Sequence, residues 1–311
     1  MIDTITMVLE PEQVKGFDID NIKAKLHPHK NIKAELNPDV FIGRINNLIV
    51  KHKNGRIYIT GSLPKVLNGN NLIIPSIDEI LALLQAITEV FELPIKLARI
   101  VGIDIGFDFE MNQPVKIYQD CFLDTPGFFR YKHNNSIYYK RDNYTLIFYD
   151  KTKEVKKNRY DEPTSNLPKG FEDKHILRYE IRFHSRVDNL FKFGVVRTLL
   201  LHSTTFRKAL LEKWKKHYFD INKAKNLILG DQIKNAPDFK KQIALNGIDK
   251  LGGRKRLMAA VKDHRNNGVI TPKSYESIQT WLRKISKNDN QFAETDYIVE
   301  LNQKVSEVIE F

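Results

Sequence analysis

Two segments of this chain alternate between apolar and polar residues, and this pattern constrains the fold more than any other feature. Within residues 100–110 the apolar positions are Ile103, Ile105, Phe107 and Phe109, and the polar face carries Asp104, Gly106 and Asp108. Within residues 175–184 the apolar positions are Tyr179, Ile181 and Phe183, and the polar face carries Arg178, Glu180, Arg182 and His184. Successive side chains of a strand point to opposite faces, so both segments predict strands with one apolar and one charged face.

Further β-like runs are bounded by turn residues, at residues 45–50, 56–61, 136–140 and 144–151. Asn54-Gly55 separates the first two runs and is a strong signal for a two-residue hairpin. Ser76 and Glu79 form a capping box, and the apolar spacing behind them predicts one helix to about residue 92. Strands with a helix between them predict an α+β fold, in which helices cover one face of an antiparallel sheet.

The second part of the chain is mainly helical by its periodicity, at residues 190–202, 205–217 and 254–266. Thr271 precedes Pro272 as a helix cap, and an apolar stripe follows it. Two short helices joined by Asn267-Gly268 resemble a helix-turn-helix, although any helical hairpin has this appearance. We therefore predict two domains, residues 1–186 with mixed strands and helices and residues 187–311 mainly helical.

Positive charge is concentrated in the predicted helical domain. The chain has a net charge of +12, and residues 187–311 hold 23 lysines and arginines against 14 acidic residues. A basic surface attracts nucleic acid. Cations at a helix start do not suit the helix dipole but do suit phosphate contacts, which favours Arg254, Lys255 and Arg256 as DNA ligands. Arg283 and Lys284, near the end of the helix expected after Pro272, are further candidates.

Several classes are disfavoured by composition. No run approaches the roughly 20 apolar residues that cross a membrane, and the first residues lack a signal-peptide pattern. The single cysteine, Cys121, excludes a disulfide framework and a structural zinc site built on several thiolates. We expect a cytoplasmic protein, in a host bacterial cell, with no membrane partner.

Three polar clusters are candidates for chemistry, and each also has an ordinary structural explanation. Asp104 and Asp108 share a strand face, where two carboxylates repel each other unless a cation or water intervenes. The alternating row of Arg178, Glu180 and Arg182 also occurs as a simple ion-pair row. A tyrosine at a strand end, here Tyr149, is most often packing; Lys151 lies two residues on and is expected on the same strand face.

Five motifs in order resemble the gene II/X family of phage and plasmid replication initiators, over about residues 1–194. The N-terminal Met1-Ile-Asp3 resembles the family's start. The segment from Ser62 to Asn71 resembles its serine-proline-lysine signature, with one leucine inserted. Ile103-Asp104 stands at an arginine-isoleucine-aspartate motif, but Gly102 replaces the arginine, so one basic contact is lost. The last two motifs are Thr145-Leu-Ile-Phe-Tyr149-Asp-Lys-Thr-Lys-Glu154 and Leu177-Arg-Tyr-Glu180-Ile-Arg182.

The resemblance implies a metal-dependent nickase that starts rolling-circle replication by joining itself to one DNA strand through a 5′-phosphotyrosine. Tyr149 is the implied nucleophile. Because a phenol with a pKa near 10 is ionised in only about one molecule in a thousand at pH 7, it needs help, which Lys151 is placed to give. Magnesium or manganese is the implied cofactor, with Asp104, Glu180 and Glu154 as oxygen ligands.

The implied partners are origin DNA, single-stranded at the nick and duplex at the recognition site, together with host helicase and polymerase. On the strands, Arg178 and Arg182 are the candidate DNA contacts. Many rolling-circle nickases bind metal through a histidine–apolar–histidine strand. The nearest match here, His27-Pro28-His29, contains a proline and is predicted to be a loop, so the chain fits a carboxylate-rich branch.

Two other functions are compatible with these residues. One is a DNA-binding replication regulator without chemistry, and the other is a metal-dependent nuclease that uses water in place of tyrosine. A pure binder does not need the motif that runs from Tyr149 to Glu154. The aromatic rings of Phe128-Phe129-Arg130-Tyr131 and Tyr138-Tyr139-Lys140 suit either base stacking or core packing.

Overall fold

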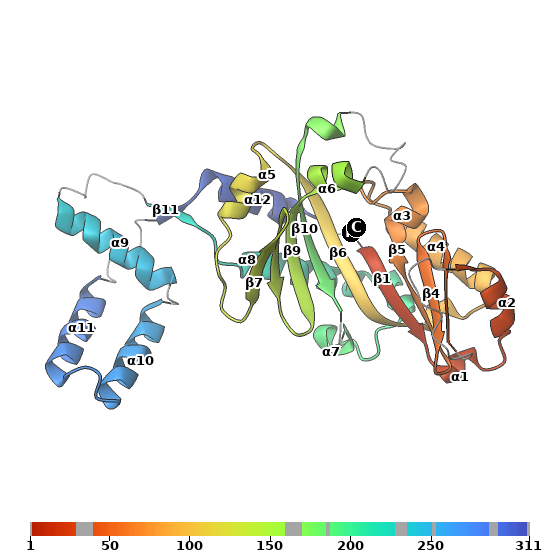
Figure 1. The fold of residues 1–311 in the computed structure, drawn as a ribbon, viewed down its shortest axis with the longest axis horizontal. Helices are drawn as coiled ribbons and strands as arrows, with labels where there is room; N and C mark the ends of the chain where they lie inside the picture. Colours follow the sequence, from red (N-terminus) through yellow and green to blue (C-terminus); the bar gives the residue numbers. More distant parts are fainter. Residues whose placement is uncertain are drawn as a thin grey trace. The chain divides into compact units, whose positions relative to one another are not determined.

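A computed structural model of the chain describes residues 2–28, 40–158, 170–184, 187–227, 235–250, 253–285 and 292–309. Its contacts divide the chain into two compact units (Figure 1). Unit 1 comprises Met1–Asn222 and Glu300–Phe311, and unit 2 comprises Lys223–Val299.

Unit 1 is built on one ten-stranded sheet in the order β2-β3-β4-β5-β1-β6-β10-β9-β8-β7. Neighbouring strands in this sheet all pair antiparallel. The strands are β1 (Ile2–Leu9), β2 (His27–Pro28), β3 (Phe41–Ile45), β4 (Leu48–Lys53), β5 (Arg56–Ser62), β6 (Arg99–Met111), β7 (Phe129–His133), β8 (Ser136–Lys140), β9 (Tyr144–Asp150) and β10 (His175–Phe183). The expected α+β class with an antiparallel sheet is confirmed.

The two alternating segments form the central strands β6 and β10, and the whole of β10 pairs with residues 103–111 of β6. Their apolar faces are buried, with Ile103, Ile105, Ile181 and Phe183 at 0% exposure. Asn54 and Gly55, both at positive φ, close the β4–β5 hairpin as expected. The run predicted over residues 45–50 is not one strand, because a turn at Asn46, also at positive φ, separates β3 from β4.

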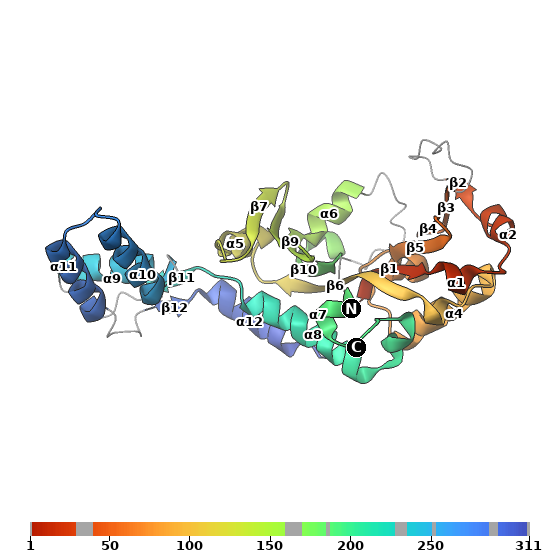
Figure 2. The same cartoon turned by 90° about the horizontal axis from the view of Figure 1, so that it is seen from below.

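Helices cover the apolar face of the sheet. Figure 2 shows α4 (Ile77–Phe91), α7 (Val187–Phe191), α8 (Thr204–Phe219) and α12 (Asp296–Glu307) along one side of it. The expected capping box of α4 is present: Ser76 accepts a hydrogen bond from the Glu79 amide, and Glu79 accepts one from the Ser76 amide. Helix α6 (Lys151–Asn158) lies on the opposite side, so helices are not confined to one face.

Aromatic packing between α8 and the sheet forms the centre of the core. Trp214 of α8 is fully buried and contacts Phe107 of β6 and Tyr179 of β10, with ring centroids 4.8 and 4.7 Å apart. Tyr179 stacks in turn on Phe148 of β9 at 4.6 Å and donates its hydroxyl proton to the Trp214 carbonyl. One helix therefore ties together the central strands that also carry the polar face.

The segment after β10 differs from the single helix predicted over residues 190–202. It consists of α7 and the 3₁₀ helix η3 (Thr198–His202). Lys192 and Gly194 adopt left-handed φ values of 56° and 69° between them, which a continuous helix does not allow. The segment packs into the core of unit 1, so the compact unit continues past the expected boundary at residue 186, to Asn222.

The smaller helices of unit 1 connect strands. They are α1 (Pro11–Val14), α2 (Ile19–Ala24), α3 (Leu63–Asn68), η1 (Ile95–Leu97), α5 (Val115–Asp120) and η2 (Phe171–Asp173). His27-Pro28, expected as a loop, forms the two-residue edge strand β2, a position where proline is tolerated. His29 and residues 159–169 lie outside the described residues.

Unit 2 contains three helices, α9 (Ala236–Lys250), α10 (Gly253–Asn266) and α11 (Pro272–Ile285), with the strand pair β11 (Lys225–Leu227) and β12 (Phe292–Glu294). Both predicted helices of the helix-turn-helix-like hairpin are confirmed. Thr271 caps α11 by accepting a hydrogen bond from the Ser274 amide. Leu245 and Ile248 of α9 pack against Leu282 and Ile285 of α11.

A search of the described part of the chain finds no helix that is long and apolar enough to cross a membrane.

We expect Trp214→Ala to lower the free energy of unfolding of unit 1 by about 3–5 kcal/mol, the usual cost of removing a large buried aromatic side chain. Urea denaturation followed by circular dichroism measures this. The chain's second tryptophan, Trp281, is 48% exposed and provides the control. Trp281→Ala should leave the unit 1 transition in place, and equal shifts in the two variants would contradict the packing described.

Candidate active site

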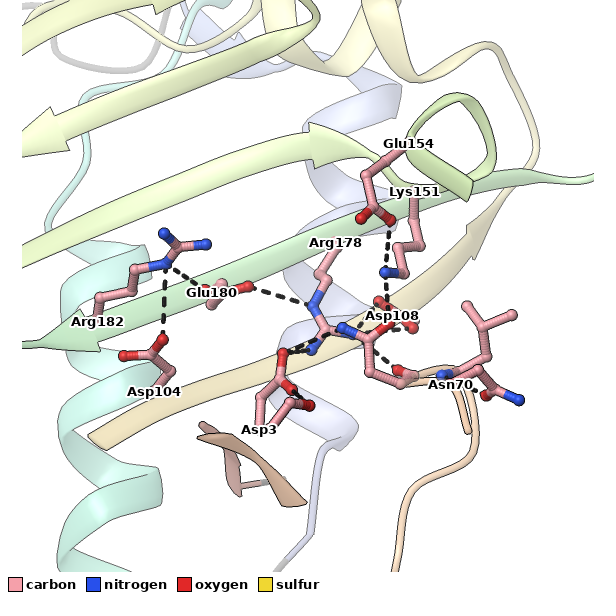
Figure 3. A network of polar contacts seen from close by, with 12 residues as sticks. Asp3, Asn70, Asp104, Asp108, Lys151, Glu154, Arg178, Glu180 and Arg182 are labelled. Atoms are coloured by element: carbon pink, nitrogen blue, oxygen red, sulfur yellow. Dashed lines mark hydrogen bonds and ion pairs between the residues drawn. The ribbon is translucent and has the colours of Figure 1, made fainter. Parts of the chain in front are cut away.

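The polar face of β6 and β10 carries a buried network of charged side chains with Arg178 at its centre (Figure 3). The Arg178 side chain has no exposed surface. Its Nη2 donates to Asp3 Oδ2 at 2.5 Å, and its Nη1 donates to Asp108 Oδ1 at 3.1 Å and to the Asn71 carbonyl at 3.2 Å. Its Nε lies 3.4 Å from Glu180 Oε2. Arg178, expected to contact DNA, instead holds carboxylates in place.

Asp3 reaches this network through an irregularity in β1. Ile2 pairs with Ile105 and Ile5 pairs with Ile103, so β1 has one residue more than β6 between these two pairs. Such a bulge changes the face to which a side chain points, which places Asp3 on the polar face although Ile2 and Ile5 both lie in the core. Sequence reasoning named Asp3 only within the Met1-Ile-Asp3 motif and not as a site residue; the available signal was a single charged residue in a β-like run.

Gly106 explains how the large Arg178 side chain fits. Gly106 lies on β6 between Asp104 and Asp108, and the guanidinium lies directly over it. A Cβ atom built at Gly106 would stand 3.0 Å from Arg178 Nε and 3.1 Å from Nη2. A methyl group here would therefore push against a guanidinium that three carboxylates hold.

The segment from Ser62 to Asn71 closes one side of the network. Ser62 donates a hydrogen bond to Asp3, and α3 ends at Gly69, whose φ of 72° turns the chain. Asn71 then contacts three residues of the network. Its side-chain amide group donates to Asp3, its side-chain oxygen accepts from Lys151, and its backbone carbonyl accepts from Arg178. The motif in this segment thus has a structural role in the site.

Tyr149 lies on the same face, near the end of β9. It pairs with Arg178 across the sheet, and its hydroxyl donates to Glu180 Oε2 at 3.3 Å. Burial, followed by the negative charge of Glu180, raises the pKa of Tyr149 well above its ordinary value. The phenol is therefore protonated in this state, and Glu180 is the carboxylate placed to accept its proton.

Lys151 differs from the expectation of a strand residue because it begins helix α6. Its side chain is 1% exposed, and its ammonium donates to Glu154 Oε2 at 2.6 Å and to Asn71 Oδ1 at 2.7 Å. The ammonium still stands 5.9 Å from the centre of the Tyr149 ring. The cation and the tyrosine are thus neighbours, as expected, although the helix rather than the strand brings them together.

Arg182 and Asp104 form the opposite end of the network. Arg182 Nε donates to Glu180 Oε1 at 2.6 Å and lies 3.7 Å from Asp104 Oδ2. Half of the Arg182 side chain is exposed, so it can contact a ligand. Burial and the charge of Glu180 raise the pKa of Asp104 to about 8. Asp104 is the carboxylate whose charge is least well compensated.

The three expected metal ligands are not gathered at one point. Figure 3 shows Glu154 with Lys151 at one end of the network and Asp104 with Arg182 at the other. Asp104 and Glu180 both lie beside Arg182 and offer carboxylate oxygens, which suit a hard divalent cation. Among the described residues, no group of three or more His, Cys, Asp or Glu side chains is arranged to hold a metal ion.

The expected duplex-binding residues lie in unit 2. Arg254, Lys255 and Arg256 are exposed in the first turn of α10, and Arg283 and Lys284 are exposed in the last turn of α11. Two further tyrosines, Tyr139 of β8 and Tyr144 of β9, are buried in the core. These two are therefore packing residues of the apolar face.

These features define an α+β protein with a charged network and a tyrosine on one face of an antiparallel sheet. A family model that describes the N-terminal part of a replication-associated protein, the phage gene II protein, matches residues 1–204. The chain belongs to this family of phage replication-associated proteins, which supports a replication initiator role and, with it, binding of origin DNA. Comparison with curated proteins finds no match.

We expect Gly106→Ala to lower the free energy of unfolding by about 1–3 kcal/mol, as over-packing does, because its methyl group meets the Arg178 guanidinium. Without that clash, replacing a strand glycine by alanine stabilises by about 0.5–1 kcal/mol. Urea denaturation measures the sign of the change.

Gly102→Ala is the matched control on the same strand and face, where the nearest atom to a new Cβ is Thr6 Cβ at 3.3 Å. It should cost less than Gly106→Ala, since no buried ion pair lies over it. A stabilised Gly106→Ala variant would show that the guanidinium is free to move.

Proposed function

We propose that the chain nicks and rejoins one strand at a DNA origin through Tyr149, and so starts rolling-circle replication. The observation that carries the proposal is the contact between the Tyr149 hydroxyl and Glu180 Oε2 at 3.3 Å, in a chain of a replication-initiator family. A nucleophile within reach of a base that a third group orients is the usual arrangement of covalent catalysis. Arg178 is that third group.

In the proposed reaction, Glu180 takes the phenol proton while the Tyr149 oxygen attacks the scissile phosphorus. The bond from phosphorus to the 3′-oxygen breaks, and the 3′-oxygen takes up a proton from solvent. The products are a 5′-phosphotyrosine and a free 3′-hydroxyl. One phosphodiester replaces another, so the reverse attack by a 3′-hydroxyl rejoins the strand without ATP.

Lys151 and Arg182 supply positive charge on the two sides of the tyrosine. The Lys151 ammonium is held by Glu154 and Asn71, so it is positioned before substrate binds and favours the phenolate. Arg182 is half exposed and is the side chain we assign to the scissile phosphate. Fixed cations are effective here because they need no reorganisation during the reaction.

We further propose that Asp104 and Glu180 would hold a magnesium or manganese ion, which would supply polarisation of the scissile phosphate when bound. Magnesium commonly uses one or two carboxylates together with substrate phosphate oxygens, so two carboxylates suffice. Glu154 has a different place in this proposal, since it pairs with Lys151.

Recognition of the origin duplex is assigned to unit 2, through Arg254, Lys255 and Arg256 of α10 and the basic end of α11. The free 3′-hydroxyl suits extension by a host polymerase. A contact with host helicase rests on the family resemblance alone.

Tyr149→Phe should abolish nicking of origin-bearing single-stranded DNA in magnesium or manganese and leave duplex binding near normal, because the variant lacks only the attacking oxygen. A denaturing gel with and without protease measures this. The parent should give a protease-sensitive shifted band, which the variant lacks. Cleavage without attached protein would favour a water-using nuclease, and binding without cleavage in any metal would favour a regulator.

The reciprocal control replaces Arg254, Lys255 and Arg256 together by alanine. This variant should keep cleavage of single-stranded DNA and bind origin duplex more weakly, with a smaller dependence on salt, because fewer phosphates are neutralised. Equal loss of both activities in either variant would contradict the division of roles.

Glu180→Gln should slow nicking by about 10²–10⁴-fold, the range that general base catalysis contributes, because an amide does not take up the phenol proton. Rates measured over a manganese titration separate two roles. Excess manganese should restore only part of the loss, since the metal replaces the lost charge but not the base. A Glu180→Gln variant that nicks at the parent rate would show that Glu180 acts neither as the base nor as a metal ligand. Glu154→Gln, which keeps a partner for Lys151, should have the smaller effect.

A further inference from the structure

Three aromatic rings lie together on the strands β7 and β8, at the edge of the sheet beyond Tyr149. Phe129 and Tyr131 of β7 are 69% and 36% exposed. Tyr131 stacks on Tyr138 of β8, with ring centroids 4.8 Å apart and planes 3° from parallel, and Phe129 lies 5.7 Å from Tyr131. The rings on the other face of β8, such as Tyr139, are buried in the core, so core packing does not account for the exposed ones.

Strand register places these rings on the face of the site. Tyr149 pairs with Ser136 of β8, and Tyr138 is two residues further along that strand. Tyr138 pairs with Tyr131 on one side and with Ile147 on the other, and Ile147 pairs with Glu180. Directly paired residues share a face, so one row runs from Tyr131 through Tyr138 and Ile147 to Glu180.

A second row adds positive charge beside the rings. Phe129 pairs with Lys140, Lys140 with Thr145, and Thr145 with Arg182. Lys140 is exposed and Arg182 is half exposed. With strands about 4.8 Å apart and a rise of about 3.4 Å per residue, the three positions lie roughly 8–17 Å from the tyrosine. Exposed aromatic faces beside cations are the combination that binds single-stranded nucleic acid.

We propose that Phe129, Tyr131 and Tyr138 form a stacking surface for unpaired bases of the strand that Tyr149 attacks. The inference rests on the proposed function for its substrate. Rings on which bases stack fix the position of the strand, while Lys140 and Arg182 contact its phosphates. Stacking is tolerant of sequence because every base has a π-face, so this surface holds the strand and leaves reading of the origin to other residues.

The test uses the full chain with Tyr149→Phe, which we expect not to cleave, and a fluorescein-labelled single-stranded oligonucleotide. Phe129→Leu and Tyr131→Leu keep apolar bulk and remove the ring face. Each should raise the Kd for single-stranded DNA by about fivefold or more, the low end of one base–aromatic stack. Phe129→Tyr and Tyr131→Phe keep the ring and should stay within about twofold of the parent. Origin-duplex affinity should not change in any of them.

Leucine variants that bind single-stranded DNA as tightly as the parent would overturn the proposal. Leucine variants that lose both single-stranded and duplex binding have failed to fold. In that case a second measurement, made on the parent, tests the stacking surface. An oligonucleotide carrying 2-aminopurine at successive positions should lose fluorescence at one or more positions on binding, as a base does when it stacks. Unchanged quenching at every position in Tyr131→Leu, or none in the parent, would contradict a stacking surface.

These outcomes are independent of the covalent chemistry. Weaker binding in the leucine variants, together with no covalent adduct in the protein that retains Tyr149, would support the stacking surface and reject the tyrosine mechanism. A normal adduct together with unchanged binding in the leucine variants would support the tyrosine mechanism and reject the stacking surface.

Discussion

The buried guanidinium of Arg178 is the interaction on which the arrangement of the polar face depends. Burying a charge is costly unless it is paired, and removing one partner of a buried ion pair costs about 3–5 kcal/mol. Arg178 has partners on three different strands: Asp3 on β1, Asp108 on β6 and Glu180 on its own strand β10. Its position in turn requires Gly106 beneath it and a bulge in β1 that turns Asp3 towards it. The polar face is therefore built around a cation that has no exposed surface of its own.

This constraint sets the chemistry available at the surface of the network. Because Arg178 and Arg182 hold Glu180 from two sides, its Oε2 stays within reach of the Tyr149 hydroxyl. Acidic side chains outnumber cations here, with Lys151, Arg178 and Arg182 facing Asp3, Asp104, Asp108, Glu154 and Glu180. Burial first, and then this excess negative charge, raises the pKa values of Tyr149 and Asp104. A site of this kind favours protonated groups until additional positive charge reaches it.

Local patterns in the sequence predicted the central strands, the hairpin at Asn54-Gly55 and the capped helix α4, because periodicity and turn chemistry determine each of them. Asp3 and the burial of Arg178 could not be predicted in this way. The first depends on a bulge between paired strands, and the second depends on the segment that ends at Asn71, which closes over the guanidinium only in the folded chain. The motif order identified the family, which supplied the role of Tyr149 that the residues alone did not.

Mass spectrometry of the protein after reaction with origin-bearing single-stranded DNA tests the central claim most directly. Trypsin cleaves after Arg141 and Lys151, so one peptide contains both Tyr144 and Tyr149, and fragment spectra distinguish the two. Nuclease trimming leaves a short nucleotide on the attacking residue. The account predicts that this mass is found on Tyr149 and that it disappears in Tyr149→Phe. A nucleotide on another residue, or cleaved DNA with no modified peptide, would contradict it.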